Sequence, residues 1–294
     1  MSDARWTIES ILRVTRDFFI SKGIESARLD AELLLADVLG LNRVQLYTHF
    51  DRPLDTEEQN RYRELVRRRA SLEPVAYILG EKEFYGRRFA VGPSVLVPRP
   101  ETEHLIDAVL RWATQHDVKR IADIGTGSGC IAVTLALELP ETSVVATDLS
   151  ADALEVAKEN ARGHGVNDRI EWHCCDLLPD SARGFDVVAS NPPYIAEGDS
   201  EVDASVHVYE PHLALFSGTD GLDLIRRLVA TAPQRLEEPG LLAFELGARQ
   251  ADAVTAMAPD FAFVEDLQGY RRIAWWERTP QSLRRMAERV TTGA

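Results

Sequence analysis

The feature that most constrains the fold is a glycine-rich loop between an apolar strand and an apolar helix. Residues 120–124 form a short apolar run typical of a buried strand, and residues 130–139 predict a helix that ends before Pro140. The loop between them reads Gly125-Thr126-Gly127-Ser128-Gly129. Alternate glycines permit a sharp turn and let the backbone approach a ligand closely. We therefore expect an α/β fold with a doubly wound sheet and a ligand at this loop.

Acidic residues end the next predicted strands, where such folds bind a nucleoside. The run 143–147 is followed by Asp148, which lies 23 residues after Gly125, near the spacing at which a carboxylate binds a ribose. A further strand, 170–175, is followed by Asp176. Parallel strands bind ligands at their carboxyl ends, so we expect the loop and both acids to share one site. The glycine loop and the two acids together predict a cofactor that carries a nucleoside.

The glycine spacing narrows the choice of cofactor. The pattern is Gly-x-Gly-x-Gly, not the dinucleotide pattern Gly-x-Gly-x-x-Gly, and the chain contains no Gly-x-x-x-x-Gly-Lys-Ser/Thr phosphate loop. Together with the preceding acid, it resembles the class I S-adenosylmethionine-dependent methyltransferases. The resemblance implies S-adenosylmethionine as the cofactor, with its adenine beside Asp176. The implied cofactor-binding residues are Asp123, Gly125, Thr126, Gly127, Ser128, Gly129, Asp148, Leu149, Asp176, Leu177 and Asn191.

A second motif, Asn191-Pro192-Pro193-Tyr194, follows the predicted strand 185–190. Two consecutive prolines lack amide donors and hold φ near −65°, so the chain leaves the strand in a stiff, extended turn. The Asn191 amide oxygen and the Pro192 carbonyl can accept both protons of a planar NH2 group, and the Tyr194 ring can cover its face. This suits methylation of an amide or amino nitrogen. An ordinary strand-to-loop turn also fits the tetrapeptide alone.

Further segments narrow the resemblance to one family. They are residues 74–80 (Pro-Val-Ala-Tyr-Ile-Leu-Gly), 83–86 (Glu-Phe-Tyr-Gly), 97–103 (Val-Pro-Arg-Pro-Glu-Thr-Glu), 209–211 (Tyr-Glu-Pro) and 245–247 (Glu-Leu-Gly). With the Asn-Pro-Pro-Tyr turn, this series resembles the release factor glutamine methyltransferases (the PrmC/HemK family) almost from end to end. The resemblance implies N5-methylation of the glutamine in the Gly-Gly-Gln motif of class I peptide chain release factors. One departure is Leu177, where the family often has an aromatic residue beside adenine.

The resemblance also implies roles for individual residues. Asn191, Pro192 and Tyr194 are the expected catalytic residues, and the expected substrate-binding residues add Pro193, Glu210 and Arg99. For Arg99 and its neighbour Glu101, a salt bridge in a domain linker is an equal alternative. For Glu210, a structural role in its loop is the alternative.

At 294 residues the chain is long enough for two domains. We expect a small N-terminal helical bundle at residues 1–73 for release-factor recognition, and a hairpin and extended linker at 74–100. The Rossmann-like methyltransferase domain is expected at 101–278 and a C-terminal tail at 279–294. Asn42-x-x-Gln45 and Thr56-x-x-Gln59 predict capping boxes at helix starts in the first domain. A polar stretch, 197–210, is expected to face the substrate, and a helix is expected at 222–236.

Charge and composition limit the classes of partner. The net charge is −14, and residues 1–73 carry 12 basic and 13 acidic side chains, so nearly all of the excess lies beyond them. An acidic surface gives no footprint for duplex nucleic acid and suits a basic protein partner, although acidity alone also serves solubility. No apolar run approaches the ~20 residues of a membrane span, and no signal peptide is evident at the start. We expect a cytoplasmic protein without a stable nucleic-acid or membrane partner.

Three cysteines give no disulfide framework, and the run His173-Cys174-Cys175-Asp176 does not predict a metal site, because successive strand residues point to opposite faces.

Two other functions stay open. One is a nucleic-acid methyltransferase acting on adenine N6 or guanine N2, since an exocyclic NH2 poses the same chemical problem. The other is a binding protein that keeps the cofactor fold without catalysis.

Overall fold

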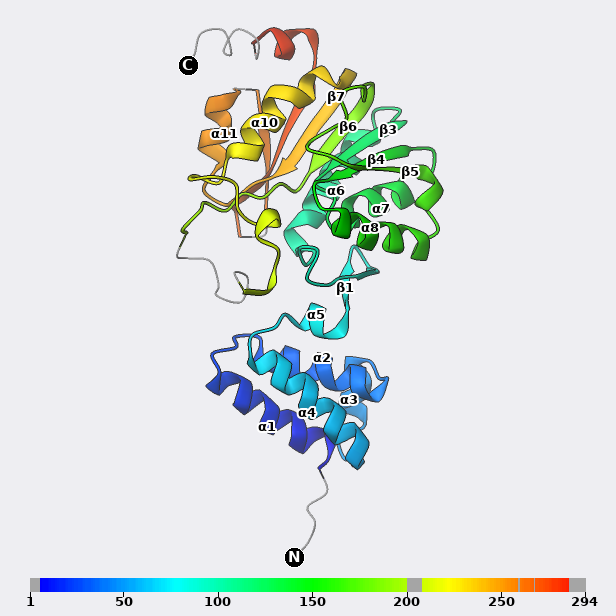
Figure 1. Cartoon of the computed structure of the whole chain (residues 1–294), viewed down its shortest axis with the longest axis vertical. Helices are drawn as coiled ribbons and strands as arrows, with labels where there is room; N and C mark the ends of the chain where they lie inside the picture. The colour runs from blue at the N-terminus through cyan, green and yellow to red at the C-terminus, as the bar shows by residue number, and fades with distance from the viewer. Residues whose placement is uncertain (1–5, 200–207, 259, 267, 286–294) are drawn as a thin grey trace, which may run out of the picture. The chain divides into compact units, whose positions relative to one another are not determined.

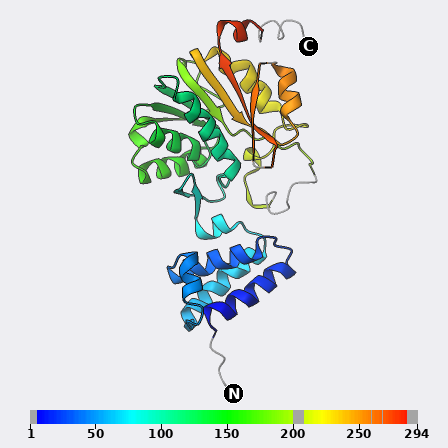
Figure 2. The ribbon, with the colours of Figure 1, turned by 180° about the vertical axis from the view of Figure 1, so that it is seen from behind.

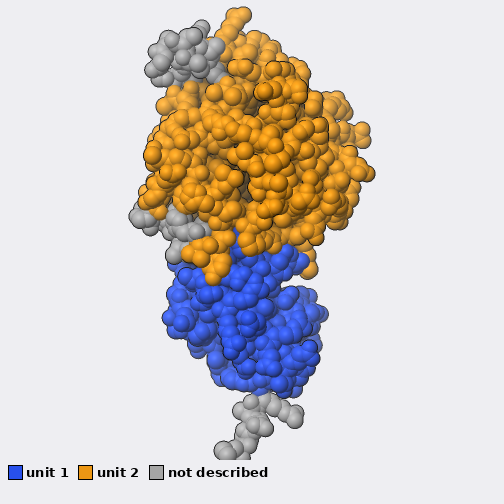
Figure 3. All heavy atoms as spheres, in the orientation of Figure 1, with its two compact units in different colours: residues 1–81 blue, residues 82–294 orange. Residues whose placement is uncertain are grey.

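The computed structural model describes residues 6–199, 208–258, 260–266 and 268–285. The chain divides into two compact units, Met1–Glu81 and Lys82–Ala294, which Figure 3 draws in different colours. Each unit has a hydrophobic core of its own. Among the described residues, no helix has both the length and the apolar character needed to cross a membrane.

The first unit is a helical bundle. Its helices are α1 (Ile8–Ser21), α2 (Ala27–Leu39), α3 (Arg43–Thr48), α4 (Thr56–Ala70) and α5 (Val75–Leu79). Large apolar side chains from several helices fill the core: Ile8, Phe19, Leu34, Leu35, Leu46 and Tyr62. Gly40 ends α2 in the left-handed region, with φ of 61°, as expected for a helix stop.

The helix starts in this unit test the two predicted capping boxes. The box at Asn42 and Gln45 is confirmed at the start of α3, because each side-chain oxygen accepts from the backbone amide of the other residue. The box at Thr56 and Gln59 is wrong. Asp55 is the N-cap of α4 instead, and it forms a capping box with Glu58. The two overlapping tetrapeptides both fit the pattern, and the carboxylate one residue earlier takes the cap.

The second unit begins with a hairpin that packs on its own core. Strands β1 (Glu81–Phe84) and β2 (Arg87–Ala90) place Phe84 and Phe89 in that core, both fully buried. The Asn160 side chain of helix α8 (Ala151–Gly163) holds β2: its Oδ1 accepts from the Ala90 amide at 2.7 Å, and its Nδ2 donates to the Ala90 carbonyl at 3.0 Å. The same Nδ2 donates to the Ser128 carbonyl at 2.8 Å, so α8 ties the hairpin to the glycine loop.

A seven-stranded sheet forms the centre of the second unit. The strands are β3 (Arg120–Ile124), β4 (Ser143–Asp148), β5 (Ile170–Cys174), β6 (Phe185–Ser190), β7 (Leu236–Glu245), β8 (Ala262–Glu265) and β9 (Arg271–Arg278). Their order is β5-β4-β3-β6-β7-β9-β8, and all neighbours are parallel except at β9. The α/β fold and its doubly wound sheet are confirmed.

Helices cover both faces of this sheet (Figures 1 and 2). On one face lie α6 (Glu103–Ala113), α7 (Cys130–Glu138) and α8 (Ala151–Gly163), and on the other α10 (Asp223–Thr231) and α11 (Ala251–Met257). Alternate residues of each strand enter opposite cores. In β6, Val187 and Ala189 face α6 and α7, whereas Val188 faces α10. This alternation decides where the residues just beyond each strand end point.

The predicted helix 222–236 is shorter than expected. Helix α10 ends at Thr231, a short 3-10 turn (Ala232–Gln234) follows, and Leu236 already begins β7. Pro233 lies in that turn and cannot continue an α-helix. The register of β7 with β6 places Ser190 opposite Phe244, so the two strands end side by side. Their carboxyl ends carry Asn191 and Glu245.

Candidate active site

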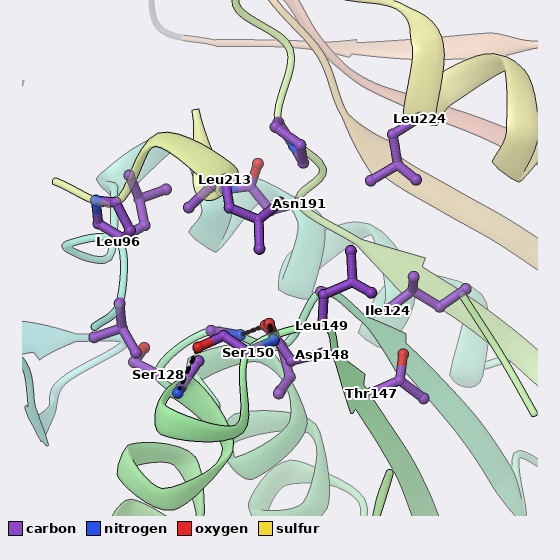
Figure 4. Close-up of a pocket in the computed structure, with 18 of the residues that line it drawn as sticks. Leu96, Ile124, Ser128, Thr147, Asp148, Leu149, Ser150, Asn191, Leu213 and Leu224 are labelled. Atoms are coloured by element: carbon purple, nitrogen blue, oxygen red, sulfur yellow. Dashed lines mark hydrogen bonds between the residues drawn. The ribbon is translucent and has the colours of Figure 1, made fainter. Parts of the chain in front are cut away.

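A cavity of about 320 Å³ lies in the second unit, at the carboxyl ends of β3, β4, β5 and β6. The strand order reverses between β3 and β6, which is where open α/β sheets bind ligands. Figure 4 shows Asn191 and Leu213 on one side of this cavity, and Asp148, Leu149 and Ser150 on the opposite side. Ten predicted site residues line it: Gly125, Thr126, Gly127, Ser128, Asp148, Leu149, Asp176, Leu177, Asn191 and Pro193.

The glycine loop owes its shape to backbone conformations that glycine adopts without strain. Gly125 and Gly127 have φ of 70° and 53°, and a Cβ built on either would meet no atom within 4 Å. Glycine is therefore required at these two positions by the positive φ and leaves room for a ligand, and not because a side chain would clash with the protein. At Gly129 the reason differs, because a Cβ there would lie 3.0 Å from the Ala157 Cβ on α8.

Asp123 stabilises this loop through hydrogen bonds. It is fully buried, and its Oδ2 accepts from the Thr126 hydroxyl at 2.6 Å and from the Ala132 amide at 3.1 Å. Its Oδ1 has no partner among the described residues. Burial raises the pKa of this carboxyl to about 7. Asp123 thus shapes the loop and is not itself part of the cavity wall.

Asp148 and Leu149 supply a wall suited to a nucleoside. Asp148 Oδ2 accepts from the Gly127 amide at 2.9 Å, and its Oδ1 accepts from the Ser150 amide at 2.8 Å, a bond drawn in Figure 4. Each carboxylate oxygen can accept a further donor, such as a ribose hydroxyl. Leu149 is 53% exposed at the cavity wall. An exposed leucine here offers an apolar face to a planar ring.

Asp176 and Leu177 lie at the cavity beyond β5. Asp176 forms an ion pair with Arg227 of α10, which also lines the cavity. Leu177 has a φ of 55°, and its carbonyl accepts from the Thr147 hydroxyl at 2.5 Å. Arg227 was not predicted, because no motif in α10 marks it. A carboxylate for ribose, an apolar wall, a second carboxylate and a glycine cradle together fit S-adenosylmethionine.

Behind the Asn-Pro-Pro-Tyr turn lies a chain of hydrogen bonds that sequence reasoning missed. Asn191 Nδ2 donates to Thr102 Oγ1 at 3.0 Å, and Thr102 Oγ1 donates to Glu245 Oε2 at 2.6 Å. The Tyr194 hydroxyl donates to Glu245 Oε1 at 3.1 Å. Both Thr102 and Glu245 are 1% exposed. We call the four residues Asn191, Thr102, Glu245 and Tyr194 the amide-anchor network.

The sheet explains why these side chains meet. Asn191 continues the alternation of Val187 and Ala189, and Glu245 continues that of Leu241 and Ala243, so both point to the face covered by α6. Thr102 immediately precedes α6 on that face. Burial raises the pKa of Glu245 to about 7. Burial, and then the charge of Glu245, also raise the pKa of Tyr194.

A second group of contacts fixes the turn at Tyr194. Gln250 Nε2 donates to the Tyr194 carbonyl at 2.8 Å, while Gln250 Oε1 accepts from the Gly247 amide at 2.9 Å. A Cβ on Gly221 would lie 2.2 Å from the Tyr194 carbonyl oxygen, so only glycine fits beside it. The turn is therefore held both at its side chains and along its backbone.

Arg99 and Glu210 form an ion pair at 2.5 Å, and Glu210 Oε2 also accepts from the Val97 amide at 3.2 Å. Glu210 is buried, and neither residue lines the cavity, although their neighbours Pro98 and Pro211 do. The pair joins two segments that form one wall. Pro192 and Tyr194 are likewise not among the residues that line the cavity, although Asn191 and Pro193 are. Of the predicted substrate-facing stretch 197–210, residues 200–207 lie outside the described residues, as do residues 286–294 of the predicted tail.

Solved structures with a similar fold include the hMettl16 catalytic domain in complex with MAT2A 3'UTR hairpin 1. It superposes with a TM-score of 0.54 at 19% identity, over 74% of this chain and 83% of that one. The complex with hairpin 6 gives 0.52 at 20% identity, over 72% and 81%. At this identity the likeness supports the fold alone.

Sequence comparisons are more specific. Residues 10–80 match the model of the PrmC N-terminal domain, and residues 103–210 match that of the methyltransferase small domain. A release factor glutamine methyltransferase of Rhodopirellula baltica is 42% identical over 92% of this chain and 96% of its own length. Another, of Geobacter sulfurreducens, is 46% identical over 86% of this chain and 88% of its length. The chain belongs to the release factor glutamine methyltransferase family.

Proposed function

We propose that this chain transfers the methyl group of S-adenosylmethionine to the side-chain amide nitrogen, N5, of the glutamine in the Gly-Gly-Gln motif of class I peptide chain release factors. The observation that carries the proposal is the placement of Asn191. Asn191 lines the cavity; its NH2 group donates to Thr102 Oγ1, while no donor among the described residues reaches its Oδ1. An amide oxygen is thus left to accept a hydrogen bond beside a cofactor-shaped cavity.

The chemical task is to make an amide nitrogen nucleophilic. Its lone pair is delocalised into the carbonyl, so the nitrogen must be held with that lone pair directed at the methyl group. Asn191 Oδ1 and the Pro192 carbonyl accept its two N–H groups. Positive charge grows on the nitrogen as it reacts, so both acceptors bind the transition state more tightly than the ground state. The Tyr194 ring, fastened at its hydroxyl by Glu245, covers the amide plane.

When bound, S-adenosylmethionine supplies an electrophilic methyl carbon whose bond to sulfur breaks as the nitrogen lone pair bonds to it. The residues of this chain do the rest by positioning, which is worth several kcal/mol in well-aligned reactions. No strong base is needed before attack, because the proton leaves the methylated nitrogen afterwards and passes to water. The Arg99–Glu210 pair holds one wall of the cavity and lies where it can order a bound peptide.

The other parts of the chain have roles in this proposal too. Residues 1–73 help to recognise the release factor, and the segment 74–100 connects them to the methyltransferase domain, 101–278. The acidic excess of the chain suits a basic protein substrate. The reaction takes place in the cytoplasm, without a stable nucleic-acid or membrane partner.

A nucleic-acid amino methyltransferase would need the same NH2-binding turn, acting on adenine N6 or guanine N2. The net charge of −14 disfavours it, because binding a polyanion requires clustered basic side chains. A cofactor-binding protein without catalysis is disfavoured by the intact amide-anchor network, which has no use in cofactor binding alone.

A methyl-transfer assay on separate candidate substrates tests the assignment. Purified, unmodified class I release factor, the same factor with Gln→Ala in its Gly-Gly-Gln motif, and ribosomal and transfer RNA are each incubated with this protein and methyl-labelled S-adenosylmethionine. We expect label in the first substrate only. Label in RNA would overturn the protein assignment, and label in the Gln→Ala factor would overturn the assigned glutamine.

A further inference from the structure

We propose that Glu245 and Thr102 are positioning residues that decide which end of the Asn191 amide faces the substrate. The inference rests on the proposed function, in which Asn191 must present its oxygen to an NH2 group. It goes beyond that function because it assigns a specific task to two residues outside the Asn-Pro-Pro-Tyr turn.

When Glu245 is ionised, the hydrogen-bond chemistry allows one arrangement only. A carboxylate has no proton to give, so the Thr102 hydroxyl must donate to Glu245, as the 2.6 Å contact to Oε2 shows. That hydroxyl has a single proton, and so it can only accept from Asn191. The Asn191 group 3.0 Å away must then be the NH2 end, and Oδ1 points to the other side. The charge on Glu245 thereby fixes the orientation of an amide two hydrogen bonds away.

The three hydrogen-bonded residues are held rigidly by three secondary-structure elements. Asn191 follows β6, Glu245 ends β7, and Thr102 precedes α6, so no member depends on a long loop. The Tyr194 hydroxyl satisfies the second carboxylate oxygen, which leaves neither oxygen of Glu245 without a donor. Hydrogen bonds aligned in one direction polarise one another, so the chain also makes Asn191 Oδ1 a stronger acceptor for a nitrogen that gains positive charge.

The arrangement predicts a dependence on pH. Burial raises the pKa of Glu245 to about 7, with a further rise from the charge of Glu101 and opposing effects of the hydroxyls of Thr102 and Tyr194 and of Arg272 on β9. Arg272 is itself paired with Asp266 at 3.0 Å. Above pH 7 Glu245 is a carboxylate, and Thr102 donates to it while accepting from the NH2 group of Asn191. Below it, a protonated Glu245 can donate to Thr102, which then donates to Asn191 and turns the amide over.

The test compares a variant that lacks the hydroxyl with one that keeps it. Thr102→Val retains the shape of the side chain and removes the hydroxyl, and Thr102→Ser retains the hydroxyl. We expect Thr102→Val to lower kcat for release-factor methylation about 10- to 100-fold while the Kd for S-adenosylmethionine stays within about threefold. Thr102→Ser should stay within about threefold of wild type in both. Equal kcat for Thr102→Val and wild type would overturn the inference.

A pH profile separates positioning from general support of the fold. We expect kcat of the wild type to fall below an apparent pKa near 7. Glu245→Gln can still accept from Thr102 with its amide oxygen, so it should retain measurable activity but lose this inflection. An unchanged inflection in Glu245→Gln would contradict the assignment of the switch to Glu245.

A spectroscopic readout keeps the inference testable if the release factor is not the substrate. The side-chain NH2 protons of Asn191, assigned by comparison with Asn191→Ala, are followed by NMR in protein labelled with 15N. Loss of the bond to Thr102 should shift one of them upfield in Thr102→Val but not in Thr102→Ser. No shift in Thr102→Val would refute the proposed series of hydrogen bonds from Glu245 to Asn191. The expected shift without methylation of the release factor would refute only the proposed substrate.

Discussion

The two sides of the active site are built in different ways. On the cofactor side, the loop 125–129 is a backbone structure, in which positive φ angles at glycines create a cradle. On the substrate side, the turn 191–194 depends on side chains that come from three distant parts of the chain. Both sides have one buried carboxyl beneath them, Asp123 and Glu245, and burial raises the pKa of each to about 7.

The two carboxyls differ in how their oxygens are used. Asp123 takes both of its donors on Oδ2 and leaves Oδ1 without a partner among the described residues. Glu245 takes one hydroxyl on each oxygen. The first therefore stiffens a loop, and the second orients an amide. No hydrogen bond between described residues joins the amide-anchor network to the glycine loop, so substitutions on the two sides are expected to act separately.

The largest expected effect is on the substrate side. Asn191→Ala removes the free acceptor at Oδ1, and we expect kcat to fall about 10²- to 10³-fold, the range seen when one preorganised catalytic hydrogen-bonding group is removed. The Kd for S-adenosylmethionine should stay within about threefold. Steady-state kinetics and calorimetry measure the two quantities. Lost cofactor affinity with normal turnover would show that Asn191 belongs to the cofactor side.

The reverse pattern is expected for the cofactor side. Gly127→Ala forces alanine to a φ of 53° and places a methyl group in the cavity wall, so the Kd for S-adenosylmethionine should rise about tenfold or more. At saturating cofactor, kcat should change less than in Asn191→Ala. Gly86→Ala is the matched control, because Gly86 also has positive φ and open space but lies in the hairpin away from the cavity. Equal loss of affinity in both variants would show that strain alone is responsible.

The smallest effect concerns stability and pH. The pKa of Asp123 lies above its ordinary value, so the folded state keeps a proton that the unfolded state releases between about pH 4 and 7. This contribution is fully present at low pH and is lost as the pH rises through 7. Asp123→Asn removes it, so wild type should lose about 1–3 kcal/mol more stability than the variant between pH 5 and 8. Urea unfolding at both pH values measures this difference, and parallel losses would contradict it.

The same contrast explains what the sequence could predict. The strand, loop and helix at 120–139 and the acids after β4 and β5 are local patterns, and the structure places Asp148 and Asp176 at the cavity as expected. Asn191 was also recognised, because the turn that carries it is a contiguous motif. The helix at 222–236 was overextended because an apolar pattern alone does not show where α10 stops and β7 begins.

Thr102 and Glu245 could not be assigned in the same way. Both lie in motifs that support the family resemblance, yet 143 residues separate them, and nothing in one motif points to the other. Their contact follows from the register of β6 and β7 and from the position of α6 over that face. Arg227 was missed for a similar reason, since only the folded chain brings α10 to Asp176.

The most direct test of the account is to locate the transferred methyl group by tandem mass spectrometry of the release-factor peptide that carries Gly-Gly-Gln. In the proposed function the Asn191 turn holds a planar NH2 group, so we expect one methyl group on the side-chain amide nitrogen of that glutamine, and N-methylglutamine derivatives after digestion. A methyl group on a backbone nitrogen, a carboxylate or a lysine would contradict the assigned chemistry, whichever macromolecule proved to be the substrate.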